Sequence, residues 1–249
     1  MRVILNCDDL GISVAVNDCI LDLMEQRRVT SATVMMNAPA TADAAKRLHR
    51  YPHCSFGVHL VGTEFKPLTA HPGLAPLLNR EGEFRGNLHR IPITPAIQEG
   101  IFAEWSAQMD RGLALGIPIS HLDSHHHVHT EPKLLRVLKR IQKRYGVRKI
   151  RITRNVYGVN ESVSHQLRMF KFAWNFALRH YIPTTTTDAF TSFETFHERL
   201  LAGIGWKGSI ELMCHPGNEL FARETQLLRG NWKHELASSA AQLISYNEL

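Results

Sequence analysis

The chain has 249 residues, of which 44% are hydrophobic and 21% charged, a composition typical of a globular protein that buries a sizeable core. No apolar run approaches the roughly 18 residues that a membrane span needs, and two aspartates follow the short apolar run at the start, which argues against a secretory signal and predicts a cytoplasmic protein. The net charge of +6 suggests an anionic partner, but no nucleic-acid-binding motif or Gly-rich phosphate loop is present, so we expect no nucleic acid.

In the first part of the chain, apolar periodicity predicts alternating strands and helices. Residues 2–6 form a buried strand, and a turn at "DDLG" leads to a helix with Ser13 as its N-cap. A strand at 31–37 precedes a helix at 41–50 that Thr41 caps, and a third strand covers 54–60. The Gly- and Pro-rich connection that follows, residues 63–92, is long enough to predict a functional loop such as a substrate-binding lid.

The second part continues the alternation. Apolar residues at a spacing of four predict a long helix from Ile97 to Leu113. Further strands are predicted at 116–123, 147–153, 184–190 and 208–214, and further helices at 131–145, 161–181, 195–204 and 235–245. Seven βα-like units without a linker predict one α/β domain over residues 1–249, with a parallel sheet in an irregular TIM-barrel-like arrangement.

Acidic and imidazole side chains lie near the C-terminal ends of four predicted strands. Asp8 and Asp9 follow the first strand, His59 ends the third, "HLDSHHHVHT" (121–130) covers the end of the fourth, and His215 follows the seventh. In a parallel sheet these ends lie at one face, where active sites are built. Each feature alone has a simpler explanation, such as a turn, a helix cap or a packed histidine, but together they favour a divalent metal site.

The histidine-rich segment cannot supply all its imidazoles to one ion. If it is extended, His121, Asp123, His125, His127 and His129 lie on one side and His126 on the other. His125, just past the strand, is then within reach of a central ion. We expect His127 and His129 to support the site or contact substrate, and Asp123 to orient one of these two.

Four motifs, "NCDDLGIS", "FGVHL", "HLDSHHHVH" and "ELMCHPG", closely resemble those of the YdjC-like carbohydrate deacetylases. The resemblance spans residues 6–217; the chain departs mildly in having Cys7 and Leu10 where Ala and Phe are common. It implies an irregular TIM-barrel-like enzyme that uses a divalent metal to remove acetyl groups from N-acetylated sugars. By motif, the implied metal ligands are Asp9, His59 and His125, the general base is Asp8, and the general acid is His215. A weaker match places Arg151 near the site, where it or a backbone N–H could stabilise the oxyanion.

The donor set suits zinc, cobalt, nickel or manganese, while family members are often assigned magnesium, so the expected cofactor is one Mg²⁺ or Zn²⁺ ion. A metal-dependent phosphoesterase is the alternative enzyme, although such sites often hold two metals and need more carboxylates. A non-catalytic sugar-binding module is the other alternative, but binding alone does not require a free carboxylate beside the ligating one.

Two basic segments bear on the substrate. Residues 133–154 contain ten of the 29 Lys and Arg residues, and 167–182 alternate aromatic with basic residues. The first fits a solvated helix face, and the second fits a helix packed in the barrel or in a homodimer interface. Alternatively, both contact lipid, which favours a glycolipid or lipid-linked substrate over free sugars.

Overall fold

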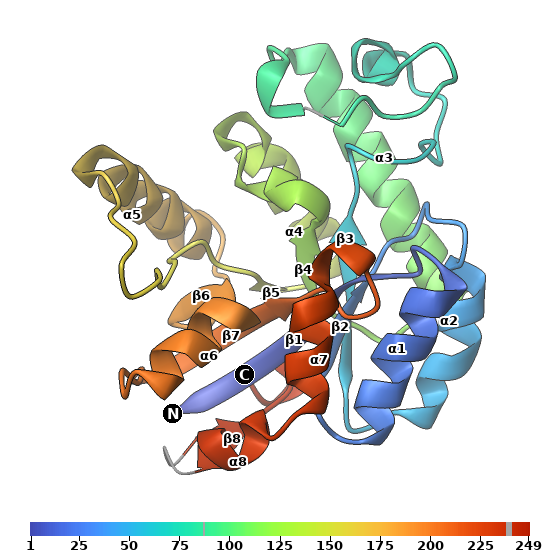
Figure 1. Ribbon diagram of the computed structural model, residues 1–249. Coiled ribbons are helices and arrows are strands. Elements are labelled where there is room, and N and C mark those ends of the chain that lie inside the picture. Colours follow the sequence, from blue (N-terminus) through green and yellow to red (C-terminus); the bar gives the residue numbers. More distant parts are fainter. Residues whose placement is uncertain (87, 238–240) are drawn as a thin grey trace.

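The predicted parallel sheet is present in the computed structural model, which describes residues 1–86, 88–237 and 241–249 (Figure 1). Over these residues the strand order is β5-β4-β3-β2-β1-β7-β6, β8 pairs with β1, and all of these pairs are parallel. The strands are β1 (Arg2–Leu10), β2 (Ser31–Val34), β3 (Ser55–Leu60), β4 (Ile119–Ser124), β5 (Lys149–Ile150), β6 (Ala189–Ser192), β7 (Ser209–Cys214) and β8 (Gln242–Leu243). Most of β1 is buried, as expected for a strand covered on both faces.

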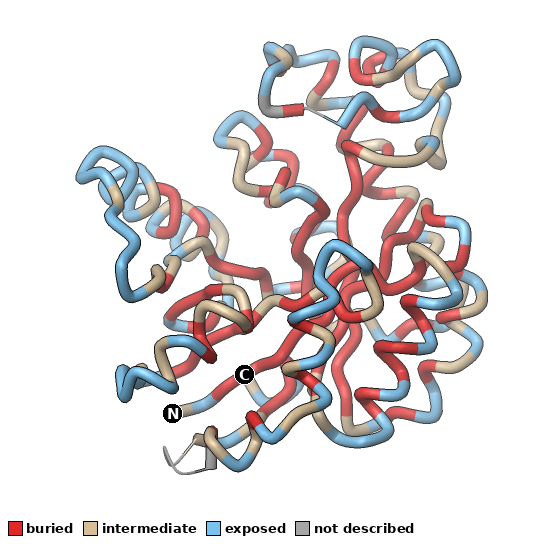
Figure 2. The backbone as a smooth tube through the Cα atoms, viewed as in Figure 1, coloured by how far each residue is buried: buried red, intermediate tan, exposed pale blue. Residues whose placement is uncertain are grey.

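Helices surround the sheet, and their outer faces are exposed while the strands are largely buried (Figure 2). They are α1 (Val14–Glu25), α2 (Thr41–Arg47), α3 (Pro95–Ala114), α4 (Leu135–Tyr145), α5 (His165–His180), α6 (Phe193–Leu201), α7 (Ala222–Arg229) and α8 (Trp232–Ala237). The Ser13 cap is confirmed, because its hydroxyl accepts a hydrogen bond from the amide of Val16. Among the helices that the structure describes, none is long and apolar enough to cross a membrane.

The two edges of the sheet are joined by an extended segment after β5. The amide of Val156 donates to the carbonyl of Phe190 at 2.9 Å, and the amide of Phe190 donates to the carbonyl of Arg154 at 3.0 Å. Phe190 lies in β6, so this segment bridges the gap between β5 and β6. The sheet therefore curls into an irregular barrel, and the predicted TIM-barrel-like α/β fold is confirmed. One large cluster of buried apolar side chains extends from Val3 to Leu236, which supports our proposal that residues 1–249 form a single domain.

Three sequence predictions need correction. Thr41 is the first residue of α2 and not its cap; its hydroxyl donates instead to the carbonyls of Met35 and Ala38, at 2.6 and 2.8 Å. The helix predicted at 235–245 is wrong, because α8 ends at Ala237 and Gln242–Leu243 pair with β1; residues 238–240 of that prediction lie outside the described part. The predicted turn at "DDLG" is also wrong in part, because β1 continues through both aspartates to Leu10.

The long connection between β3 and α3 is anchored to the body of the protein. Buried Glu104 of α3 accepts hydrogen bonds from the backbone amides of Leu68 and Thr69, each at 3.0 Å. Short 3-10 turns at Pro72–Leu77 and Leu88–Arg90 shape the rest of it, apart from Asn87, which is outside the described residues. The start of the connection is held by Asn37, which follows β2 and whose side-chain amide donates to the carbonyl of Glu64 at 2.9 Å.

The basic segment 133–154 is not one solvated surface. Lys139 and Arg151 are each only 1% exposed. The exposed Arg140 forms a bidentate ion pair with Glu99 of α3, with N–O distances of 2.5 and 3.0 Å. The sequence expectation of a solvated basic face therefore applies to part of α4 only.

Candidate active site

Three predicted metal ligands converge at the C-terminal ends of β1, β3 and β4. The carboxylate oxygen Oδ1 of Asp9 lies 2.9 Å from Nδ1 of His125 and 3.2 Å from Nε2 of His59. One donor atom from each of the three side chains lies within 4.8 Å of the others. All three residues are buried, although they come from strands far apart in the sequence.

The backbone at Asp9 explains how two adjacent aspartates reach the same site. In a regular strand, neighbouring side chains point to opposite faces. The pairing of β1 with β2 shifts register between Cys7 and Leu10, and Asp9 has a positive φ of 64°. Aspartate tolerates this left-handed conformation better than most residues. The irregularity turns Asp9 back towards the site that Asp8 faces.

His59 is held by a carboxylate on its second ring nitrogen. Nδ1 of His59 lies 2.6 Å from Oδ1 of Asp123, which leaves Nε2 facing Asp9. Burial lowers the pKa of His59, but the charge of Asp123 and its hydrogen bond outweigh burial and raise that pKa to about 10. A carboxylate on the distal nitrogen is the usual way to orient a metal-binding imidazole. Asp123 thus lies where it can orient His59, and the prediction that it orients His127 or His129 needs correction.

His125 starts a turn that ends the extended course of β4. His126 and His127 both have positive φ, 51° and 55°, so the alternation predicted for residues 121–129 fails after Ser124. The turn places Nε2 of His125 at 2.6 Å from Oε2 of Glu64, which belongs to the anchored connection. Burial lowers the pKa of His125, while its hydrogen bonds to Asp9 and Glu64 outweigh burial and raise it. Sequence reasoning missed Glu64; its place four residues beyond the end of β3 was the available signal.

Asp8 is bound on both oxygens by Arg151. The two guanidinium nitrogens Nη1 and Nη2 donate to Oδ2 and Oδ1 of Asp8 at 2.7 and 2.6 Å. Burial raises the pKa of Asp8, but the charge and hydrogen bonds of Arg151 outweigh burial and hold it well below the usual value. Asp8 is therefore ionised at neutral pH.

Arg151 also binds two further buried carboxylates. Its Nη2 lies 2.8 Å from Asp123, and its Nε donates to Glu211 at 2.9 Å. The hydroxyl of Tyr246 donates to the other oxygen of Glu211 at 2.5 Å. Sequence reasoning missed Glu211 and Tyr246; a glutamate inside the apolar strand "SIELMC" was the available signal.

His215 lies at the mouth of the site, beyond β7. Its Nε2 is 4.0 Å from Oδ2 of Asp8, its ring stacks on Phe221, and its side chain is 15% exposed. Burial lowers the pKa of His215, and it outweighs the opposing effect of the nearby carboxylates. His215 thus faces Asp8 from the more accessible side.

Of the remaining histidines, His126 lies beside His125, with ring centroids 3.9 Å apart, and forms a second group of possible metal donors with His125 and Glu64. The other three lie away from the converging ligands. His121 is buried, stacks on Tyr246 with ring centroids 3.7 Å apart, and lies 3.1 Å from the side-chain oxygen of Asn6. His129 is buried against the hydroxyl of Ser124 at 2.5 Å. His127 is half-buried and lines a small cavity with Arg151, so it can meet a ligand from that side.

The donor atoms fit a divalent metal ion. Two imidazoles and one carboxylate converge, and hydrogen-bonding carboxylates hold both imidazoles in place. Asp8 lies beside these three residues, but both of its carboxylate oxygens accept hydrogen bonds from Arg151. The arrangement separates one carboxylate that can bind an ion from another that can accept a proton.

Comparisons with known proteins show which family and which fold the chain shares. The family model of the YdjC-like proteins matches residues 2–242. A carbohydrate deacetylase of Geobacillus stearothermophilus is 34% identical over 98% of this chain and 96% of its own length, and one of Halalkalibacterium halodurans is 30% identical over 94% and 93%. A crystal structure from Enterococcus faecalis, described as that of a cellobiose-phosphate cleavage protein, superimposes with a TM-score of 0.78 at 24% identity, covering 99% of this chain and 98% of that one. This last likeness shows a shared fold.

Proposed function

Because the chain belongs to the YdjC-like protein family, we propose that it is a metal-dependent carbohydrate deacetylase that hydrolyses the N-acetyl group of an amino sugar and releases acetate. The observation that carries the proposal is the pairing of Asp8 and Asp9. One carboxylate converges with His59 and His125, and the other lies beside them on Arg151. A simple binding site would need no such second carboxylate.

In this proposal Asp9, His59 and His125 hold one divalent ion, Mg²⁺ or Zn²⁺. When bound, the ion polarises the amide carbonyl and lowers the pKa of a neighbouring water molecule. Asp8 removes a proton from the attacking water, and its weak basicity suffices because that water is already acidified. Arg151 keeps Asp8 ionised and fixes both of its oxygens.

His215 serves as the general acid. Its Nε2 lies 4.0 Å from Oδ2 of Asp8, so both groups can reach the same bound amide. The protonated form of His215 donates to the nitrogen of the departing sugar amine. Its lowered pKa makes that protonated form a stronger acid than an ordinary histidine.

The position of Arg151 indicates that it acts by positioning Asp8, and that it does not contact the oxyanion directly. Its side chain is fully buried, and its nitrogens point to Asp8, Asp123 and Glu211. We therefore propose that Arg151 positions Asp8 and that a backbone N–H stabilises the oxyanion, where a bound ion would add its positive charge. His127, on the small cavity beside Arg151, is the proposed sugar contact, while the buried His129 supports the turn through Ser124.

The substrate class proposed is an N-acetylglucosamine-containing oligosaccharide or lipid-linked glycan. The lipid-linked form is favoured by the exposed aromatic residues of α5, which lies next to the small cavity that reaches the site. Alternatively, these aromatic residues of α5 lie in the interface of a homodimer.

Acetate release from a panel of N-acetylated sugars and lipid-linked sugars tests the proposal. We expect release from at least one member, its loss after treatment with a chelator, and its recovery when Mg²⁺ or Zn²⁺ is restored. Hydrolysis of phosphate esters without acetate release would contradict the proposal and favour the phosphoesterase. Sugar binding without hydrolysis, in protein shown to contain the ion, would favour the binding module.

A further inference from the structure

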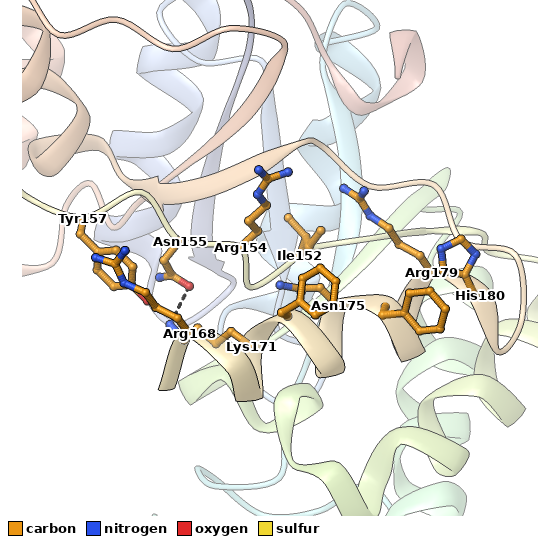
Figure 3. Close-up of a pocket in the computed structure, with 11 residues that line it drawn as sticks. Ile152, Arg154, Asn155, Tyr157, Arg168, Lys171, Asn175, Arg179 and His180 are labelled. Carbon is orange, nitrogen blue, oxygen red and sulfur yellow. Dashed lines mark hydrogen bonds between the residues drawn. The ribbon is translucent and has the colours of Figure 1, made fainter. Parts of the chain in front are cut away.

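A basic cavity of about 560 Å³ lies between α5 and the extended segment 152–157 (Figure 3). Four of the side chains that line it carry a permanent positive charge: Arg154, Arg168, Lys171 and Arg179. No aspartate or glutamate is among the described residues that line it. A cavity with cations and no anions favours an anionic ligand.

The protein offsets the positive charges of this cavity only in part, through the charge of Asp188, which interacts with Arg179 and Arg154 without a direct ion pair. Lys171 donates to the side-chain oxygen of Asn155 at 2.8 Å, and Arg179 donates to Thr186 and to the carbonyl of Thr187. Over the part of the chain that the structure describes, no carboxylate lies within 4.0 Å of the cationic groups of these two residues or of Arg154 and Arg168. Helix α5 itself contains no acidic residue.

Large apolar side chains stand exposed on the same helix. Phe172 is 69% exposed and Phe176 59%, and both also line the basic cavity. Leu167, Met169, Phe170 and Tyr181 are exposed as well. Helix α5 buries few of its residues, Trp174, Asn175 and Leu178, and it stands at the edge of the molecule, away from α1 and α2 (Figure 1). So much exposed aromatic surface indicates an interaction site.

We propose that α5 and the basic cavity bind the surface of a membrane that contains anionic phospholipids. The arginines and Lys171 bind the lipid phosphates, and the exposed phenylalanines enter the boundary between headgroups and acyl chains. This combination of a basic face and aromatic side chains is that of helices that lie in the membrane interface. A small soluble anion would leave the aromatic residues in water, and a second copy of α5 would bring two sets of cations together.

A smaller cavity lies between the basic cavity and Arg151 of the candidate active site. It has a volume of about 130 Å³, shares Asn155 and Lys171 with the basic cavity, and reaches His127 and Arg151 at its other end. Membrane binding through α5 would therefore place this opening of the site close to the lipid surface. The inference goes beyond the proposed reaction and does not depend on it, because binding can be measured without any sugar.

Flotation with lipid vesicles tests the inference. We expect the wild-type protein to float with vesicles of phosphatidylcholine mixed with phosphatidylglycerol, and not with phosphatidylcholine alone, and to be released by added salt. The double variant Arg154→Gln, Arg168→Gln should partition about 30-fold more weakly, since each basic residue near an anionic surface contributes about a fivefold factor. Phe172→Ser with Phe176→Ser should also weaken binding.

A matched control variant removes two positive charges at a different part of the surface. Arg50 and Arg80 are exposed and lie outside α5 and the basic cavity, so Arg50→Gln with Arg80→Gln should float as the wild type does. All variants should keep their circular dichroism spectrum, because the substituted side chains are exposed. The inference is overturned if the wild type fails to bind the anionic vesicles at low salt, or if the Arg154/Arg168 variant binds like the control. It is also overturned if the phenylalanine variant turns a dimer into a monomer while vesicle binding is unchanged.

Discussion

The guanidinium of Arg151 donates hydrogen bonds of 2.7 and 2.6 Å to the two carboxylate oxygens of Asp8, and both side chains are almost completely buried. This two-point contact fixes the plane of the carboxylate as well as its charge. The same guanidinium reaches Asp123, which in turn holds His59. One cation therefore orients both the proposed base and, through Asp123, one of the proposed metal ligands.

Arg151→Met should destabilise the protein strongly. The change leaves Asp8, Asp123 and Glu211 buried without their cation, and breaking a buried ion pair in this way costs about 3–5 kcal/mol of unfolding free energy. Urea denaturation measures the loss. Arg140→Met is the matched control, because it breaks the exposed pair with Glu99 and should cost at most about 1 kcal/mol. Equal losses for the two variants would contradict this account.

Asp8→Asn should keep the metal ion and lose turnover. Asparagine cannot accept the proton of water, and loss of a general base typically slows a reaction by about 10²–10⁴-fold. Metal content after dialysis and the rate of acetate release measure the two effects. Asp9→Asn is the contrasting variant and should lose the ion as well as the activity. Turnover like that of the wild type in Asp8→Asn would exclude Asp8 as the base.

Glu64→Gln should weaken metal binding by about tenfold, as expected when a carboxylate that orients a metal-binding histidine is lost. Glu64 lies 2.6 Å from Nε2 of His125, and glutamine keeps its size while removing its charge. Equilibrium dialysis against the metal measures the affinity. Glu81→Gln, an exposed change in the same connection, should leave the affinity unaltered. If both variants bind the metal as the wild type does, Glu64 has no part in orienting His125.

Lys139 should make the stability of the protein depend on pH in the alkaline range. Burial lowers its pKa from 10.5 to about 8, so between these values the unfolded chain binds the proton more tightly than the folded protein. Folding stability then rises with pH, because the unfolded state binds more protons. The unfolding free energy of the wild type, minus that of Lys139→Met, should increase from pH 8 to 10.5 in urea titrations. A difference that is constant or falls over this range would refute the assignment.

The regular elements could be predicted from the sequence, because their signals are local. The apolar runs of β1, β3 and β7 and the four-residue spacing along α3 identified those elements. The predictions failed where a distant contact decided the structure. Residues 242–244 form hydrogen bonds with the start of β1, for example between the amide of Ile244 and the carbonyl of Val3. No local pattern records such a contact.

The convergence of Asp9, His59 and His125 could be anticipated, because parallel strands bring their C-terminal ends to one face. The separate roles of the other polar residues could not be anticipated from the sequence. It depends on the left-handed turn at His126 and His127, which removes His129 from the face that alternation would give it. It also depends on Arg151, whose three carboxylate partners come from three different strands.

Tyr246 closes the polar interior of the barrel from the last part of the chain. Its hydroxyl binds Glu211, its ring stacks on His121, and its amide donates to Ser55. These contacts join residues far apart in sequence, and contacts of that kind form slowly during folding. The network that supports Arg151, and with it the proposed base, is thus completed only after Tyr246 has been synthesised and has packed against the barrel. During refolding, activity should return in the slowest kinetic phase, later than helical circular dichroism.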